Sequence, residues 1–110
     1  MDFLEPRSDA SRYRLLVVPT LFPVTDAQAA WLEAYVRDGG TLVVGPLTGM
    51  SDASLRVVTG GYPGVLRELL GVRGEEIHPL APQETRTLSD GTVVEEWTEL
   101  LAATDAEVLA

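Results

Sequence analysis

Three consecutive patterns decide the fold: Leu15-Leu16-Val17-Val18, then Thr25–Gly40, then Thr41-Leu42-Val43-Val44-Gly45. The first and third are continuous apolar runs, which predict strands covered on both faces. The middle segment predicts a helix. A strand, a helix and a second strand in close succession form a βαβ unit, in which the two strands are parallel. We therefore expect an α/β domain.

The predicted helix has signals at both ends. Thr25 and Gln28 have the spacing of a capping box, in which each side chain accepts a hydrogen bond from the other residue's amide. Asp26 lies in the first turn, where the helix dipole favours an anion. Gly39-Gly40 predicts the end of the helix. One apolar stripe runs along it, formed by Trp31, Leu32, Tyr35 and Val36.

Further elements are predicted toward the C-terminus. Residues 45–52 form a loop that leaves the carboxyl end of the second strand, and about 64–70 form a short helix ended by Gly71. Ser89-Asp90-Gly91 lies between two β-prone runs, 85–88 and 92–95, and predicts a hairpin. Residues 106–110 are expected to form a last short strand.

Charge and composition exclude several classes of partner. The chain has 17 acidic and 8 basic residues, a net charge of −9, so phosphate backbones and anionic membranes would repel it. We expect neither nucleic acid nor membrane as a partner. Cysteine is absent, so disulfides and thiolate chemistry are impossible. No signal-peptide pattern is seen, and a cytoplasmic location is expected.

Few residues are candidates for catalysis. His78 is the only histidine, so a Ser-His-Asp triad would have to combine it with a serine such as Ser51 or Ser54. No nucleophile-elbow motif occurs, and we expect His78 to lie on the surface. No His-x-x-His or Glu-x-x-His pattern occurs either, so neither a metal site nor a cofactor is expected.

Five segments together resemble, in order, the middle domain of glycoside hydrolase family 42 (GH42) β-galactosidases. They are Tyr13–Thr20, Ala34–Val44, Gly49–Asp52, Gly60–Val72 and Ala106–Ala110. The resemblance implies a flavodoxin-like fold similar to class I glutamine amidotransferases, a three-layer sandwich with a mainly parallel sheet. It also implies a non-catalytic trimerisation domain, whose parent enzyme is a homo-oligomer with its catalytic glutamates in a preceding barrel domain.

The sequence departs from the family pattern at its beginning. Family members have another strand and helix before the segment that matches Asp2-Phe3-Leu4, and that strand lies centrally in a flavodoxin-like sheet. Residues 1–110 are therefore expected to be a single, incomplete domain that lacks its first strand and helix. Such a sheet would expose backbone edges or pair its strands differently.

Two functional hypotheses stay open at this stage. In the first, the chain is an oligomerisation module without catalytic residues of its own. Trp31 and Tyr35 are interpreted as core aromatics and not as a sugar platform, but their stripe is wide enough for part of it to face another subunit. The expected interface residues are Trp31, Tyr35 and Tyr62.

In the second hypothesis, the chain is a small ligand-binding α/β domain. Ligands of open α/β sheets bind at the carboxyl ends of the strands, where the loop 45–52 begins. The predicted ligand-binding residues are Thr20, Pro46, Thr48 and Asp52. Within an intact trimer the same loop, which is rich in glycine and proline, is expected to border a neighbour's active-site mouth.

Overall fold

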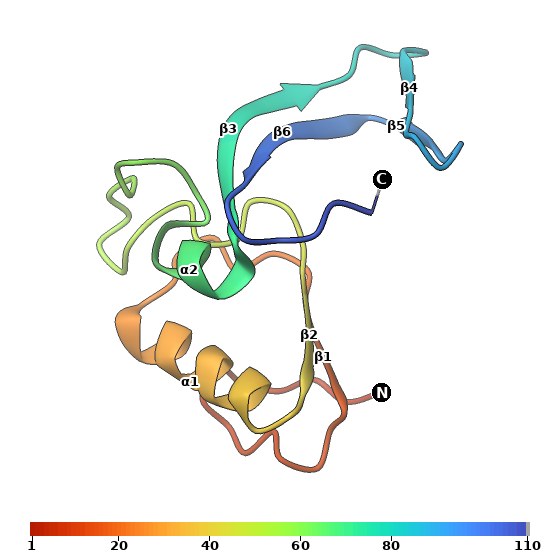
Figure 1. Ribbon diagram of the computed structural model, residues 1–110. Helices are drawn as coiled ribbons and strands as arrows, with labels where there is room; N and C mark the ends of the chain where they lie inside the picture. The colour runs from red at the N-terminus through yellow and green to blue at the C-terminus, as the bar shows by residue number, and fades with distance from the viewer. Residues whose placement is uncertain (110) are drawn as a thin grey trace.

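The computed structural model describes residues 1–109, and a parallel strand pair with one long helix forms the body of the molecule (Figure 1). Strand β1 spans Leu15–Val18, helix α1 Asp26–Arg37 and strand β2 Thr41–Val44. The strands pair in parallel, with Leu15 opposite Thr41 and Val18 opposite Val44. The predicted βαβ unit is confirmed.

Helix α1 begins and ends as its sequence predicts. The Thr25 side chain accepts a hydrogen bond from the Gln28 amide at 3.2 Å, and the Gln28 side chain accepts one from the Thr25 amide at 2.9 Å. The helix ends before Gly39, whose φ of +96° lies in the left-handed region that glycine tolerates best. The capping box and the glycine stop are both confirmed.

The body is covered on one face of its strand pair only. The core contains Val24, Leu32 and Leu66, and Leu16, Val18 and Leu42 pack against it from the inner face of the sheet. On the outer face Leu15, Val17 and Val43 stay about half exposed, at 54%, 52% and 48%. The expectation of strands covered on both faces is wrong for residues 1–109, because α1 covers the inner face alone.

A short helical segment completes the core. A single 3-10 turn, η1, spans Gly64–Leu66 and continues into α2, Arg67–Leu70, as the sequence predicts. Leu66 is fully buried. Gly71 ends α2 at a φ of +64°, and a Cβ there would lie 2.8 Å from the Ala106 amide nitrogen. Glycine is therefore required for both conformation and space.

Residues 72–103 form an arm that projects from the body (Figure 1). Strand β3, Val72–Pro79, pairs antiparallel with β6, Trp97–Ala103, and a bulge interrupts their register between Gly74 and Glu76. At the far end β4, Thr85–Thr87, pairs antiparallel with β5, Val93–Glu95. The predicted hairpin is confirmed, whereas β3 was not predicted.

The architecture differs from the expected sandwich. Residues 1–109 form three two-stranded sheets, of which only β1–β2 is parallel. A mainly parallel sheet is not seen in this part of the chain, because β1 and β2 have a helix on one face only and the strands of the arm pair with one another instead. Residues 2–4 and 106–109 form no strand, and Ala110 lies outside the described residues. No helix within 1–109 is long and apolar enough to cross a membrane.

Candidate functional site

A cleft of about 520 Å³ lies between the end of β2 and the base of the arm. The loop after β2 forms one wall, and β6 forms the other. Its polar and aromatic lining residues are Thr48, Tyr62, Trp97, Thr98 and Glu99. The structure thus places a cleft at the strand end where the sequence predicts ligand binding.

Glu99 links β6 to Tyr62, which lies in the segment just before η1. The Tyr62 hydroxyl donates a hydrogen bond to one oxygen of its carboxylate, and the Trp97 indole donates to the other at 2.9 Å. Burial, together with the neighbouring Glu99 carboxylate, raises the pKa of Tyr62 well above its usual value. Tyr62 packs directly on Gly74, where a Cβ would lie 2.1 Å from the ring. This cluster anchors the arm to the body.

The residues predicted for ligand binding are brought together only in part. Thr20 donates hydrogen bonds to the Pro19 and Pro46 carbonyls, at 2.7 and 3.2 Å, which joins the ends of the two strands. Thr48 is fully buried, and its hydroxyl accepts a hydrogen bond from the Leu21 amide. Pro46 and Thr48 border the cleft. The hydroxyl of Thr48 therefore serves the fold.

Asp52 organises its own loop. Its carboxylate accepts hydrogen bonds from the amides of Ser54 and Arg56, at 2.8 and 3.0 Å. Side chains of aspartate commonly stabilise turns in this way. Asp52 does not line the cleft.

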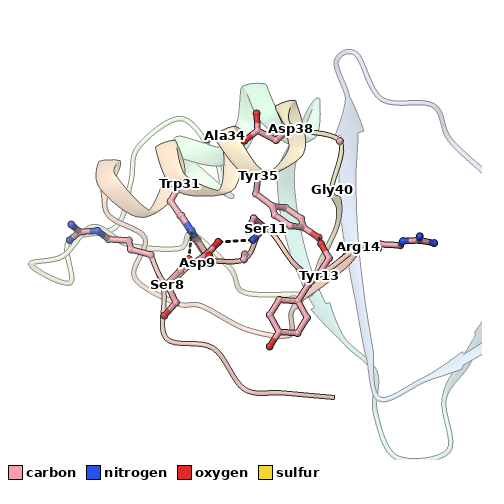
Figure 2. Close-up of a pocket in the computed structure, with 13 residues that line it drawn as sticks. Ser8, Asp9, Ser11, Tyr13, Arg14, Trp31, Ala34, Tyr35, Asp38 and Gly40 are labelled. Carbon is pink, nitrogen blue, oxygen red and sulfur yellow. Dashed lines mark hydrogen bonds between the residues drawn. The ribbon is translucent and has the colours of Figure 1, made fainter.

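A larger groove, about 690 Å³ in volume, separates residues 7–14 from the C-terminal half of α1 (Figure 2). Trp31 and Tyr35 project into it from α1. The Trp31 indole donates a hydrogen bond to the Ser8 carbonyl at 2.9 Å, and the Tyr35 hydroxyl donates to the Tyr13 carbonyl at 3.1 Å. Two of the three predicted interface residues, Trp31 and Tyr35, therefore hold the N-terminal segment against the helix and line this groove, whereas Tyr62 lies in the cleft at the base of the arm.

The groove carries charges of both signs. Arg7 and Arg14 border it, and within residues 1–109 neither forms an ion pair. Asp9 accepts a hydrogen bond from the Ser11 amide at 2.9 Å, and the hydrogen bonds from Ser11 lower the pKa of Asp9. Asp38 is the second carboxylate. The groove is thus neutral overall in an acidic protein.

The hydrolase candidates do not form a triad. His78 lies exposed on β3, where its backbone carbonyl accepts a hydrogen bond from Thr98. Ser51 is buried and donates to a backbone carbonyl, and Ser54 is exposed in a loop. Within residues 1–109 no hydrogen bond joins His78 to either serine, and no cluster of three metal-ligating side chains is found in that part of the chain.

Sequence reasoning missed the cluster at the base of the arm. Trp97 and Glu99 are two residues apart, which in a strand places them on one face, and this was the available signal. Their partner Tyr62 lies 37 residues before Glu99. No local pattern could have identified that pair.

The βαβ body and its projecting arm define a small α/β domain with a surface groove but no assembled catalytic constellation in residues 1–109. The whole chain, residues 1–110, matches the family model described as the β-galactosidase trimerisation domain. The chain therefore belongs to this family. The resemblance of its five ordered segments to the middle domain of GH42 β-galactosidases is confirmed.

Similar proteins include a β-galactosidase of Arthrobacter sp., which is 43% identical over 97% of this chain. A crystal structure of β-galactosidase from Bacillus circulans sp. alkalophilus is 30% identical over 94% of the chain, with a TM-score of 0.85. Gan42B, a GH42 β-galactosidase from G. stearothermophilus, is 29% identical over 94%, with a TM-score of 0.82. The chain spans only 15–17% of the length of these proteins.

Proposed function

We propose that this chain is the non-catalytic trimerisation domain of a GH42 β-galactosidase. The observation that carries the proposal is the family match over all 110 residues. The chain corresponds to 15% of the Arthrobacter β-galactosidase, so the glycosidase glutamates are proposed to lie in a barrel domain outside these residues. The parent enzyme is accordingly a homo-oligomer, and this domain supplies contacts between its subunits.

Exposed apolar surface supports a role in association. Large side chains on both the body and the arm are at least half exposed, including Leu15, Val17, Leu100 and Leu101. Large exposed apolar side chains, where they gather into a patch, mark contact sites in soluble proteins. We propose that Trp31 and Tyr35 reach the subunit interface through the groove, and that Tyr62 contributes through its anchor at the base of the arm.

The exposed outer face of β1–β2 also supports a more specific fold for the parent domain. Parallel strands are normally covered on both faces, whereas the outer face of β1–β2 exposes Leu15, Val17 and Val43. Within residues 1–109 β1 and β2 pair only with each other. We propose that the βαβ body is one part of a flavodoxin-like three-layer sandwich that further strands and helices of the parent enzyme complete.

The test is the size of the chain in solution. Sedimentation velocity over a range of concentrations is expected to show a trimer in exchange with the monomer. Galactoside hydrolysis by the same sample is expected to be absent. A strict monomer at the highest concentration would contradict the proposal, and so would hydrolysis that persists in a sample free of contaminating enzyme.

The cleft beside Pro46 favours a second role for the loop 45–52. This loop leaves the carboxyl end of β2 and borders a cleft of about 520 Å³. We propose that in the trimer it borders the active-site mouth of a neighbouring subunit. Exchanging the loop in the full-length Arthrobacter β-galactosidase should change its substrate preference, whereas unchanged preference and unchanged trimer stability would refute this role.

Ligand binding by the domain itself is the alternative function for the cleft. A shift in thermal unfolding with galactosides, and none with nucleotides, would support it. The variant Glu99→Gln should then reduce the shift, and Glu76→Gln on the exposed side of the arm is the matched control. No shift with either class of compound would remove the alternative.

A further inference from the structure

A ring of three subunits requires two different surfaces on every copy. Each copy contacts one neighbour with the first surface and the other neighbour with the second, in a head-to-tail arrangement. Our inference rests on the proposed trimerisation function and concerns which two surfaces meet. The groove is one concave candidate, and the arm is a projecting one.

Among residues 1–109 the strands of the arm pair only with one another. An isolated two-stranded ribbon is marginally stable in water. Body contacts hold the arm at its base, through the Tyr62–Glu99 hydrogen bond and a 2.6 Å bond from the Gly74 amide to the Tyr62 carbonyl. Toward the tip, Leu88 and Val93 are 38% and 57% exposed. The tip therefore offers apolar surface to another molecule.

The arm also accounts for more than half of the protein's net negative charge. Residues 72–103 contain seven acidic side chains and two arginines, which gives a net charge of −5 out of −9 for the chain. Both arginines already pair within the arm, Arg73 with Glu75 and Arg86 with Glu84. At the tip, Asp90 and Glu95 form no ion pair among residues 1–109.

Within residues 1–109 the groove carries unpaired arginines and aromatic surface, which the tip of the arm could contact. Arg7 and Arg14 are exposed at its border and form no ion pair among the described residues. Trp31 and Tyr13 provide partly exposed aromatic surface between them. Figure 1 places the tip of the arm and α1 on opposite sides of the molecule, so that the two surfaces suit contact between copies.

We propose that the tip of the arm, residues 85–95, docks into the groove of the next copy of this chain. Asp90 and Glu95 face Arg7 and Arg14 of the neighbour, and the apolar side chains of the tip cover the aromatic wall. Asp9 and Asp38 also border the groove, so the pairing of Asp90 and Glu95 with the two arginines, and not the net charge of either surface, sets the register of the contact. Repetition of this contact three times closes the ring.

Charge exchange between the two surfaces tests the proposal. The groove variant combines Arg7→Glu and Arg14→Glu, and the arm variant combines Asp90→Asn and Glu95→Arg. Asparagine at position 90 keeps an acceptor for the Thr92 amide, which Asp90 holds at 2.8 Å. Each variant should weaken trimer formation about tenfold or more, because like charges then meet in the contact. Combining the two variants should restore at least part of the affinity.

Two controls separate this contact from a general effect of net charge. Arg56→Glu and Glu107→Arg change exposed charges outside the arm and the groove. These variants should leave the dissociation constant within about twofold of the wild-type value, as expected for charges remote from an interface. Circular dichroism of each variant confirms that it remains folded.

Cross-linking supplies a second readout that does not depend on charge. The chain has no cysteine, so an introduced pair reports on one contact alone. Ser89→Cys at the tip with Ser11→Cys in the groove should oxidise to covalent dimers and trimers. Ser89→Cys with Ser54→Cys in the loop after β2 is the matched control and should remain monomeric after denaturation.

The outcomes distinguish this inference from the function on which it rests. Weakening by each variant, recovery in the combination and selective cross-links support the docking. A wild-type trimer that neither variant weakens, or that forms no selective cross-link, overturns the docking and leaves the trimerisation function standing. A wild-type chain that never self-associates overturns both.

Discussion

The body and the arm of this domain are stabilised in different ways. The most deeply buried apolar side chains, Val24, Leu32 and Leu66, at 2% exposure or less, lie in the body, whereas Leu80 in the arm is 9% exposed. In the arm, Val93, Leu100 and Leu101 are each more than half exposed. The body therefore depends on apolar burial. The arm depends on its backbone ladder, on the anchor around Glu99 and, under our proposal, on a neighbouring copy.

The difference has a functional meaning. A surface reserved for a partner must stay exposed in the isolated chain, and exposed apolar surface contributes little to its stability. The body can consequently remain folded while the arm opens locally, because regions with few buried contacts have low opening free energies. The following predictions probe this contrast.

Removing the centre of the core should have the strongest effect. Leu32 is fully buried against Val24 and Leu66, so Leu32→Ala leaves a cavity and should lower the free energy of unfolding by about 2–5 kcal/mol. Urea unfolding followed by circular dichroism measures the change. The same substitution in the arm, Leu100→Ala, is the matched control and should cost under about 1 kcal/mol at concentrations below assembly. An equal loss of unfolding free energy in the two variants would show that body and arm are not stabilised differently.

Removing the anchor should loosen the arm. Glu99→Ala deprives the Tyr62 hydroxyl and the Trp97 indole of their acceptor, which should cost about 1–3 kcal/mol. Hydrogen exchange should show lower protection of the β6 amides, with α1 unchanged. Glu76→Ala, on the exposed part of β3, is the control and should leave protection intact. Equal loss of protection in α1 would show that body and arm open together.

Removing the helix cap should affect the body alone. Thr25→Ala eliminates both the cap of the Gln28 amide and the reciprocal geometry of the capping box, at a cost of about 1 kcal/mol. The change is measured as a shift of the urea midpoint. Thr25→Ser keeps the hydroxyl and should retain most of the stability. Loss of arm protection in the alanine variant would contradict the separation of the two regions.

The weakest effect is expected in alkaline solution. Burial and Glu99 raise the pKa of Tyr62 in the folded state, so the folded chain holds this proton more tightly than the unfolded chain. The resulting stability is fully present below about pH 10, the usual pKa of tyrosine, and is lost as the pH rises above it. The midpoint temperature of thermal unfolding should therefore fall more steeply between about pH 9 and 11 in the wild type than in Tyr62→Phe.

Tyr13→Phe is the companion variant for this pH experiment. A hydrogen bond to Asp2 raises the pKa of Tyr13, which is partly exposed to solvent near the N-terminus and outside the arm. Solvent screening should make its contribution to the alkaline slope smaller than that of Tyr62. An unchanged slope in Tyr62→Phe would show that the Tyr62–Glu99 contact does not stabilise the folded arm.

The contrast between the regions also explains which predictions from sequence succeeded. The βαβ body, the capping box at Thr25, the short helix ended by Gly71 and the hairpin around Asp90 are all confirmed. Each depends on residues that are close in the chain. Their signals are hydrogen bonds, glycine conformations and periodic apolar residues within one or two elements.

The elements that were missed or wrongly predicted depend on residues that are far apart in the chain. Strand β3 contains a glycine, three charged residues and a terminal proline, and it became a strand because β6 pairs with it across a bulge. The predicted strand at the C-terminal end has no partner among the described residues, and residues 106–109 form none. For the site, Pro46 and Thr48 border the cleft at the strand end and their role in ligand binding stays a prediction, whereas the Glu99 cluster depends on Tyr62 from a remote segment.

Local signals in the amino-acid sequence thus determine the body: two strands, the helix between them and the turns that end each element, together with the family to which the chain belongs. Tertiary structure alone decides that β3 and β6 form a projecting arm, that Glu99 anchors it, and that the outer face of β1–β2 stays exposed. The physical reason is that strand pairing and burial depend on contacts between segments far apart in the chain, which no local pattern of residues specifies.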